Sequence, residues 1–126
     1  MHPRSFLRLE GLAALCAALA GYVALGGSIW LLALLALAPD VAMLGYLAGP
    51  RIGSLSYNVA HTYALPLSLG AVGLWLGVDV AVLVALVWAG HIGADRLVGY
   101  GLKFDSGFSD THLSPQSAAD PVTAGK

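Results

Sequence analysis

The stretch SIWLLALLALAPDVAMLGYLA, from Ser28 to Ala48, decides the fold class. Asp40 is its only ionisable residue, and every other position but Ser28 is apolar, small or aromatic. A helix rises about 1.5 Å per residue, so about 20 such residues cross the roughly 30 Å hydrocarbon core of a bilayer. The stretch therefore predicts a membrane-spanning helix, with Ser28 as its N-cap.

Three further segments of the same kind lie at 6–25, 52–76 and 78–98, separated by glycine-containing turns. The chain is 58% hydrophobic and 10% charged, with a mean hydropathy of +0.78, which excludes a soluble domain. We predict an all-α, polytopic membrane protein whose four-transmembrane-helix bundle occupies 1–113. Residues 114–126 are predicted to form a disordered polar tail. Glu10 interrupts the basic and apolar start of the chain, so we expect a retained span there and not a cleaved leader.

The basic residues are distributed unevenly over the predicted turns. They lie at the chain start, in the turn after Ala48 and from the end of the last span onward: Arg4, Arg8, Arg51, Arg96, Lys103 and Lys126. Four spans place these three regions on one side of the membrane. The positive-inside rule then predicts that both termini are cytoplasmic.

Polar side chains within the spans gather in the predicted cytoplasmic leaflet, about 6 to 14 Å from its helix ends. They are Glu10, Asp40, Asn58, His61, His91 and Asp95. An intramembrane ionisable group costs several kcal/mol unless it is paired or binds something, so each is a functional candidate. The spacings of Asn58 with His61, and of His91 with Asp95, place each pair on one helical face.

Two histidines and two aspartates make an N2O2 ligand set for zinc or another divalent metal: Asp40, His61, His91 and Asp95. Candidate catalytic side chains surround this set. Glu10 and Asn58 are expected to support the ligands or act as a base, whereas Arg96 and Lys103 lie at the cytoplasmic mouth. The two basic side chains are suited to anionic lipid headgroups, which we favour, or to a substrate phosphate. Asp110 and His112 either fold over the site or belong to the solvated tail.

Each of these residues also has a structural interpretation. Intramembrane histidine and asparagine side chains commonly form interhelical hydrogen bonds. Asp95 has basic neighbours with which it could pair. Pro39 is expected to bend its span and free a backbone carbonyl, while Gly45 and Gly49 are expected to pack closely against another helix.

The segments LRLEGLA, APDVAMLGYLAGPRIG, YNVAHTYALPL and HIGADRLVGYGLKFDSGFSDTHL resemble the domain-of-unknown-function 4260 family of small bacterial membrane proteins. That resemblance implies a location in the bacterial inner membrane. The order Pro-Asp, His-Thr, His-x-x-x-Asp and Gly-Tyr-Gly is more loosely similar to inner-membrane metal-dependent hydrolases related to zinc phospholipase C. It implies the ligands Asp40, His61, His91 and Asp95. This chain carries Ala42 and Ala60 where those proteins have a second acidic residue and an arginine.

Three functions are consistent with the sequence. The first is a membrane-embedded, metal-dependent hydrolase acting on a lipid or amphiphilic phosphoester from the cytoplasmic leaflet. The second is a non-enzymatic module, either a packing subunit or a small proton or ion pathway. The third is a haem protein with His61 and His91 as axial ligands. Membrane lipid is the expected partner, association with further copies of the chain is left open, and no basic surface suits nucleic acid.

Overall fold

The computed structural model describes residues 2–103 and residue 111 of the chain. This part of the chain is α-helical, as predicted, and contains four segments that are long and apolar enough to cross a membrane. They are Pro3–Ala24, Ile29–Ala48, Pro50–Leu76 and Asp79–Val98. The fold is therefore that of a multi-pass membrane protein. The predicted tail, 114–126, lies outside the described residues, and so do Asp110 and His112.

The first and last segments are single helices, α1 (Pro3–Ala24) and α5 (Asp79–Val98), whereas each middle segment is divided in two. The second consists of α2 (Ile29–Leu35) and a 3₁₀ helix, η1 (Ala38–Ala48). The third, expected to be one helix, consists of α3 (Pro50–Ala60) and α4 (Ala64–Leu76). Both divisions occur next to residues of the predicted metal set.

Prolines occupy the first turn of four of these helices. Pro3, Pro39 and Pro50 lie at the first or second position of α1, η1 and α3, and Pro66 is the third residue of α4. The first turn of a helix has no intrahelical acceptors for its N–H groups, so proline costs little there. Pro39 thus marks the division of the second segment, as expected of a proline that interrupts a span.

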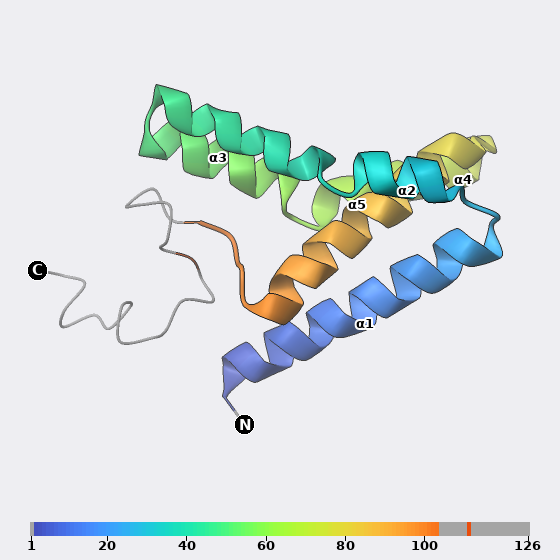
Figure 1. The fold of residues 1–126 in the computed structure, drawn as a ribbon, viewed down its shortest axis with the longest axis horizontal. Helices are drawn as coiled ribbons and strands as arrows, with labels where there is room; N and C mark the ends of the chain where they lie inside the picture. The colour runs from blue at the N-terminus through green and yellow to red at the C-terminus, as the bar shows by residue number, and fades with distance from the viewer. Residues whose placement is uncertain (1, 104–110, 112–126) are drawn as a thin grey trace, which may run out of the picture.

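The helices form a V when viewed as in Figure 1. One limb contains α1 and α5, and the other contains the hairpin of η1 and α3. The limbs converge where α2 and α4 lie and diverge toward the N-terminus and the turn between η1 and α3. The end of α5 also lies on this open side, which agrees with four successive crossings.

Close backbone contact holds α1 against α5. A Cβ added to Gly11 would lie 2.6 Å from the Gly93 carbonyl oxygen, and one added to Gly93 would lie 2.7 Å from that of Gly11. Both distances are too short for a real Cβ, so only glycine permits this approach. Because Gly11 is near the start of α1 and Gly93 near the end of α5, the two helices run antiparallel. We call this contact the glycine seam.

The two glycines predicted to pack closely have different roles. Gly45 does pack tightly, because a Cβ there would lie 2.0 Å from the Ser56 hydroxyl oxygen of the facing helix. The prediction for Gly49 is wrong: nothing lies within 4 Å of its Cβ position. Gly49 has a φ of +113° and forms the turn between η1 and α3, a backbone conformation that glycine adopts readily.

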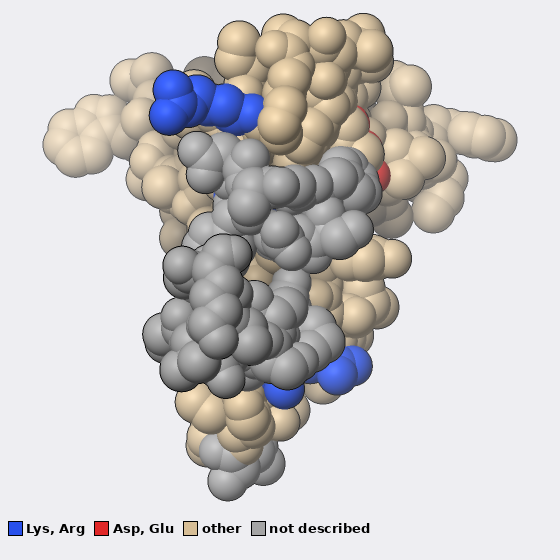
Figure 2. Space-filling view, turned by 90° about the vertical axis from the view of Figure 1, so that its left-hand side faces the viewer, with Lys and Arg blue, Asp and Glu red and all other residues tan. Residues whose placement is uncertain are grey.

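The surface of the described chain is largely apolar, as a membrane protein requires. Trp30, Leu47 and Trp75 are each more than four-fifths exposed. Figure 2, which faces the open side of the V, shows Lys and Arg side chains near the end of each limb. Among the described residues, the basic positions are the start of α1, the start of α3 and the end of α5 and the segment after it, all on this side.

Candidate metal centre

Four side chains from three segments converge where the two limbs meet. Ligand atoms of Asp40, His61, His91 and Asp95 all lie within 4.8 Å of one another. We call these four residues the His-Asp cluster. The structure thus brings together the four residues that the sequence proposed as metal ligands.

The interruptions in the helices place two members of the cluster. Asp40 lies in the first turn of η1, directly after Pro39, and His61 caps the end of α3. On α5, His91 and Asp95 lie one turn apart and face the same side. The break between α3 and α4 therefore presents His61 toward α5.

Backbone carbonyl groups determine which ring nitrogen of each histidine faces the cluster. The Nδ1 atom of His61 lies 2.8 Å from the carbonyl oxygen of Tyr57, and His91 Nδ1 is bonded to the carbonyl of Ala36. A carbonyl only accepts hydrogen bonds, so each Nδ1 carries a proton. In the neutral rings Nε2 then has a free lone pair, which is the form that binds metals.

The distances around the cluster match tetrahedral coordination. The Nε2 atoms of His61 and His91 are 3.3 Å apart. Asp40 Oδ1 lies 3.0 and 3.1 Å from these two nitrogens, and Asp95 Oδ2 lies 3.5 and 3.4 Å from them. Zinc bonds of about 2.0 to 2.1 Å place the ligands of a tetrahedral site about 3.3 Å apart. Five of the six ligand pairs thus have a separation suited to one shared ion.

The same arrangement needs added positive charge, because the groups that face one another are all hydrogen-bond acceptors. Two imidazole lone pairs and two carboxylates are all acceptors, and they face one point. Such groups repel one another unless protons or a cation lie between them. The cluster is therefore a site for cations or for bound protons.

Surrounding side chains fix His61 in place. Its ring is fully buried and stacks on Tyr57, with centroids 3.8 Å apart and planes within 7°. Arg96 donates a hydrogen bond of 3.1 Å from Nη2 to the carbonyl oxygen of His61, which the end of α3 leaves without a helical partner. Arg96 therefore stabilises the backbone between α3 and α4. It is buried, with only 7% of its surface exposed, and does not lie in the solvent on the cytoplasmic side as the sequence predicted.

A cavity of about 220 Å³ borders the cluster, with both Asp40 and Asp95 in its wall. Tyr57, Tyr100 and Lys103 line other parts of it. The Lys103 Nζ atom lies 4.4 Å from the centre of the Tyr57 ring. Burial lowers the pKa of Lys103 from its ordinary value, while the charges of Asp95 and Asp40 act against this. Lys103 thus lines the same cavity as two of the proposed ligands.

The side chain of Asn58 positions Lys103, and its hydrogen bonds go to the Lys103 backbone and not to the four ligands. Its side-chain amide donates to the Lys103 carbonyl oxygen at 2.7 Å, and its Oδ1 accepts from the Lys103 N–H at 2.6 Å. This pair joins α3 to the segment after α5 and so links the two limbs of the V. Lys103 also forms an isolated antiparallel bridge with Thr111.

Glu10 is exposed on α1 and does not belong to the His-Asp cluster. Tyr57 and Ala36 were not predicted from the sequence. Tyr57 could have been found, because it lies four residues before His61 and so on the same helical face. Ala36 acts through its backbone carbonyl, for which the sequence contains no signal.

Comparison with known proteins identifies the family. Residues 4–115 match the model of the family described as domain of unknown function (DUF4260), and the chain belongs to this family. No curated protein and no solved structure matches the chain.

Proposed function

We propose that this member of the DUF4260 family is a membrane-embedded, metal-dependent hydrolase of a lipid or amphiphilic phosphoester. The observation that carries the proposal is the geometry of the His-Asp cluster. Four acceptor atoms face one point at tetrahedral spacing, and both histidines have their Nδ1 protons held by carbonyl groups. Hydrogen bonding between helices alone does not require two Nε2 atoms to face each other at 3.3 Å.

A divalent ion, with zinc as the best match to two nitrogen and two oxygen ligands, would supply a Lewis acid and lower the pKa of a bound water. Hydrolysis would add the hydroxyl of a water to phosphorus, break the P–O bond to the alcohol and deliver the other proton to that alcohol. A catalytic zinc site keeps one position open for water, so His61, His91 and Asp95 would bind the ion, and Asp40, whose side chain is 36% exposed and borders the cavity, would accept the proton. The chain's own residues can therefore supply both the ligands and a proton acceptor.

The cavity beside the cluster supports a phosphoester substrate. Its wall contains the carboxylates of Asp40 and Asp95 and the side chain of Lys103. With the carboxylates neutralised by a metal ion, a phosphate in this cavity would gain from the ammonium group of Lys103. Asn58 holds the Lys103 backbone and so would act as a positioning residue.

The haem alternative receives less support. Axial histidines bind opposite faces of a flat macrocycle that passes between their nitrogens. His61 and His91 have their Nε2 atoms 3.3 Å apart, and Asp40 Oδ1 lies 3.0 to 3.1 Å from both. This spacing suits one small ion better than a porphyrin.

We infer that the open side of the V faces the cytoplasm of a bacterial inner membrane, so that substrates enter from the inner leaflet. The basic residues at that side support this orientation. A reporter fused after Lys126 should be cytoplasmic, and one inserted between Gly26 and Gly27 should be external. Finding both reporters on the same side would contradict the topology.

Metal analysis of the detergent-purified protein tests the proposal. We expect close to one equivalent of a divalent metal in the parent, and loss of that metal in His61→Ala and His91→Ala. His2→Ala is the matched control, because His2 is exposed at the start of α1 and far along the chain from the cluster. It should retain the metal.

Activity is then measured on mixed micelles of phosphatidic acid or phosphatidylglycerol, as release of phosphate or of the phosphorylated headgroup. Chelator should abolish release in the parent and in His2→Ala, and added zinc should restore it. A parent without metal, unaffected by chelator, would overturn the hydrolase proposal and leave the packing module as the better interpretation.

A further inference from the structure

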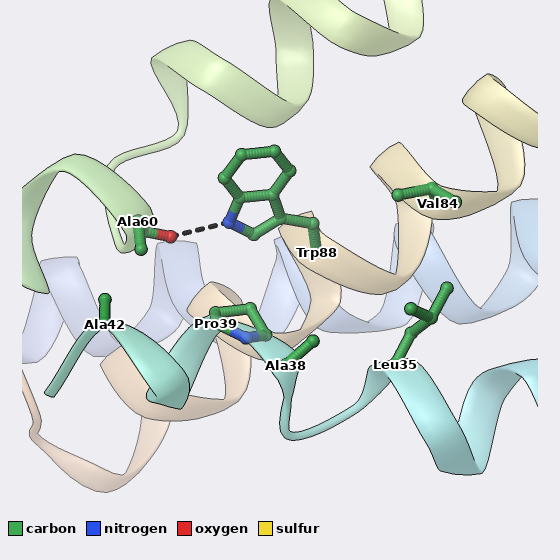
Figure 3. Close-up of a pocket in the computed structure, with 7 residues that line it drawn as sticks. All are labelled: Leu35, Ala38, Pro39, Ala42, Ala60, Val84 and Trp88. Carbon is green, nitrogen blue, oxygen red and sulfur yellow. Dashed lines mark hydrogen bonds between the residues drawn. The ribbon is translucent and has the colours of Figure 1, made fainter. Parts of the chain in front are cut away.

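A second, apolar cavity of about 270 Å³ lies on the other side of the residues that carry the cluster. Figure 3 shows its lining: Pro39 and Ala42 of η1, Ala60 at the end of α3, and Trp88 and Val84 of α5, with Leu35 of α2 beside Val84. We call this cavity the chain groove.

The chain groove lies next to residues of the cluster, although none of the four ligands lines it. Pro39 directly precedes Asp40, Ala60 directly precedes His61, and Trp88 lies one turn before His91. Three of the four ligands therefore have a neighbour in the groove wall. A molecule in the groove would have one end next to the cluster.

From this end the groove extends away from the open side of the V. Trp88 and Val84 are successive turns of α5 in the direction of its start, and Figure 3 places Leu35 and Val84 together at the end remote from Ala42. The end of the groove at Ala42 and Ala60 thus lies nearer the open side, beside the cluster, and the end at Leu35 and Val84 lies deeper. An amphiphile in a bilayer has the same orientation, with its polar group nearer the membrane surface and its hydrocarbon chain deeper.

Small side chains and a fixed aromatic ring form the groove. Ala42 and Ala60 leave the space open, and the Trp88 indole donates a 2.6 Å hydrogen bond from Nε1 to the Ala60 carbonyl oxygen. This bond satisfies the only polar atom of the ring, so Trp88 offers the groove its carbon surface.

We propose that the chain groove binds one hydrocarbon chain of the substrate lipid and places its phosphoester at the His-Asp cluster. The proposal rests on the hydrolase function for the role of the cluster. It adds that the shape of the groove selects the chain that it binds, because small side chains leave the space that the chain occupies. Ala42 and Ala60 then act as specificity residues.

Photo-crosslinking tests the site without relying on catalysis. The probe is phosphatidic acid with a 16-carbon chain that carries a diazirine near its middle, added to the parent in mixed micelles and mapped by mass spectrometry. We expect crosslinks concentrated on groove residues such as Leu35, Val84 and Trp88. Crosslinks spread evenly over exposed residues of all helices would show ordinary surrounding lipid and overturn the proposal.

Ala42→Leu partly fills the groove and should lower crosslinking of the 16-carbon probe about tenfold relative to the parent. Ala71→Leu is the matched control, because Ala71 is exposed on α4 and outside the groove, and it should have no effect. Ala38→Leu, at an exposed position of the groove wall, replaces Ala42→Leu if that variant does not fold. Equal crosslinking in parent and filled variants would also overturn the proposal.

Crosslinking of the parent, read together with its metal content and activity, separates the two proposals. If groove crosslinks persist in a parent that contains no metal, the chain groove is a lipid site and the hydrolase function is wrong. If the parent binds metal and hydrolyses the lipid but no groove crosslinks form, the hydrolase function stands and the chain groove is wrong.

Discussion

The two sides of α5 differ in what holds them to the rest of the molecule. On one side Gly93 contacts α1 through backbone atoms at the glycine seam. On the other, His91 and Asp95 join the His-Asp cluster with side chains from η1 and α3. Gly93 lies between these two residues in the sequence, so a single turn of helix serves both contacts.

The difference shows that shape and charge specify separate contacts within one membrane helix. The glycine seam depends on the absence of side-chain volume and involves no charge, so ions and pH should not affect it. The cluster gathers two carboxylates and two imidazoles, and under the proposed function it depends on a cation at its centre. Added side-chain volume should therefore break the glycine seam and leave the cluster intact, whereas removal of the cation should do the reverse.

The largest expected effect is that of metal removal on the cluster. If free metal exceeds its Kd about a thousandfold, chelation should lower the free energy of unfolding by about 4 kcal/mol. Protons compete with metal for the imidazole nitrogens, so this difference should shrink on acidification. Melting in detergent with and without chelator, at neutral and acidic pH, measures both effects. Identical melting under all conditions would contradict metal binding.

Gly11→Ala should break the glycine seam. Its Cβ would lie 2.5 Å from Arg96 Cβ and 2.8 Å from the Leu97 nitrogen, and neither atom can move without moving α5. We expect a loss of about 2 to 3 kcal/mol by overpacking, measured by melting in detergent.

Gly21→Ala is the control on the same helix, since its Cβ would meet only Leu86 methyl carbons at 3.5 Å. It should be neutral or slightly stabilising. The chelator response should persist in Gly11→Ala, provided that the variant folds. Equal stability of the two alanine variants would show that the seam is not a tight contact.

The smallest effect concerns the link between the limbs. Asn58→Ala removes both hydrogen bonds to the Lys103 backbone, and because water can replace them at this edge we expect a loss of only about 1 kcal/mol. Hydrogen exchange at the Lys103 amide should become faster while metal content stays unchanged. Ser68→Ala, which removes a local bond to Ala64 on exposed α4, should leave that amide as protected as in the parent.

Depth and helical spacing in the sequence were sufficient to predict that Asp40, His61, His91 and Asp95 come together. An unpaired charge inside a membrane is costly, so ionisable residues at one depth are expected to pair with one another. The break at His61 could not be predicted, because YNVAHTYALPL has no glycine, and its proline lies after the break. The glycine seam was equally hidden, since Gly11 and Gly93 are far apart in the chain and only packing pairs them.

The broken third segment has a consequence for how the protein is made. Three carbonyl groups at the end of α3 have side-chain partners: that of Tyr57 bonds to His61, that of Ala60 to Trp88 and that of His61 to Arg96. Two of these partners belong to α5, which is synthesised last. A segment that enters the bilayer before them satisfies its backbone best as one continuous helix. We therefore expect the break, and with it the complete cluster, to form when α5 inserts and docks, so that biogenesis intermediates lack the site.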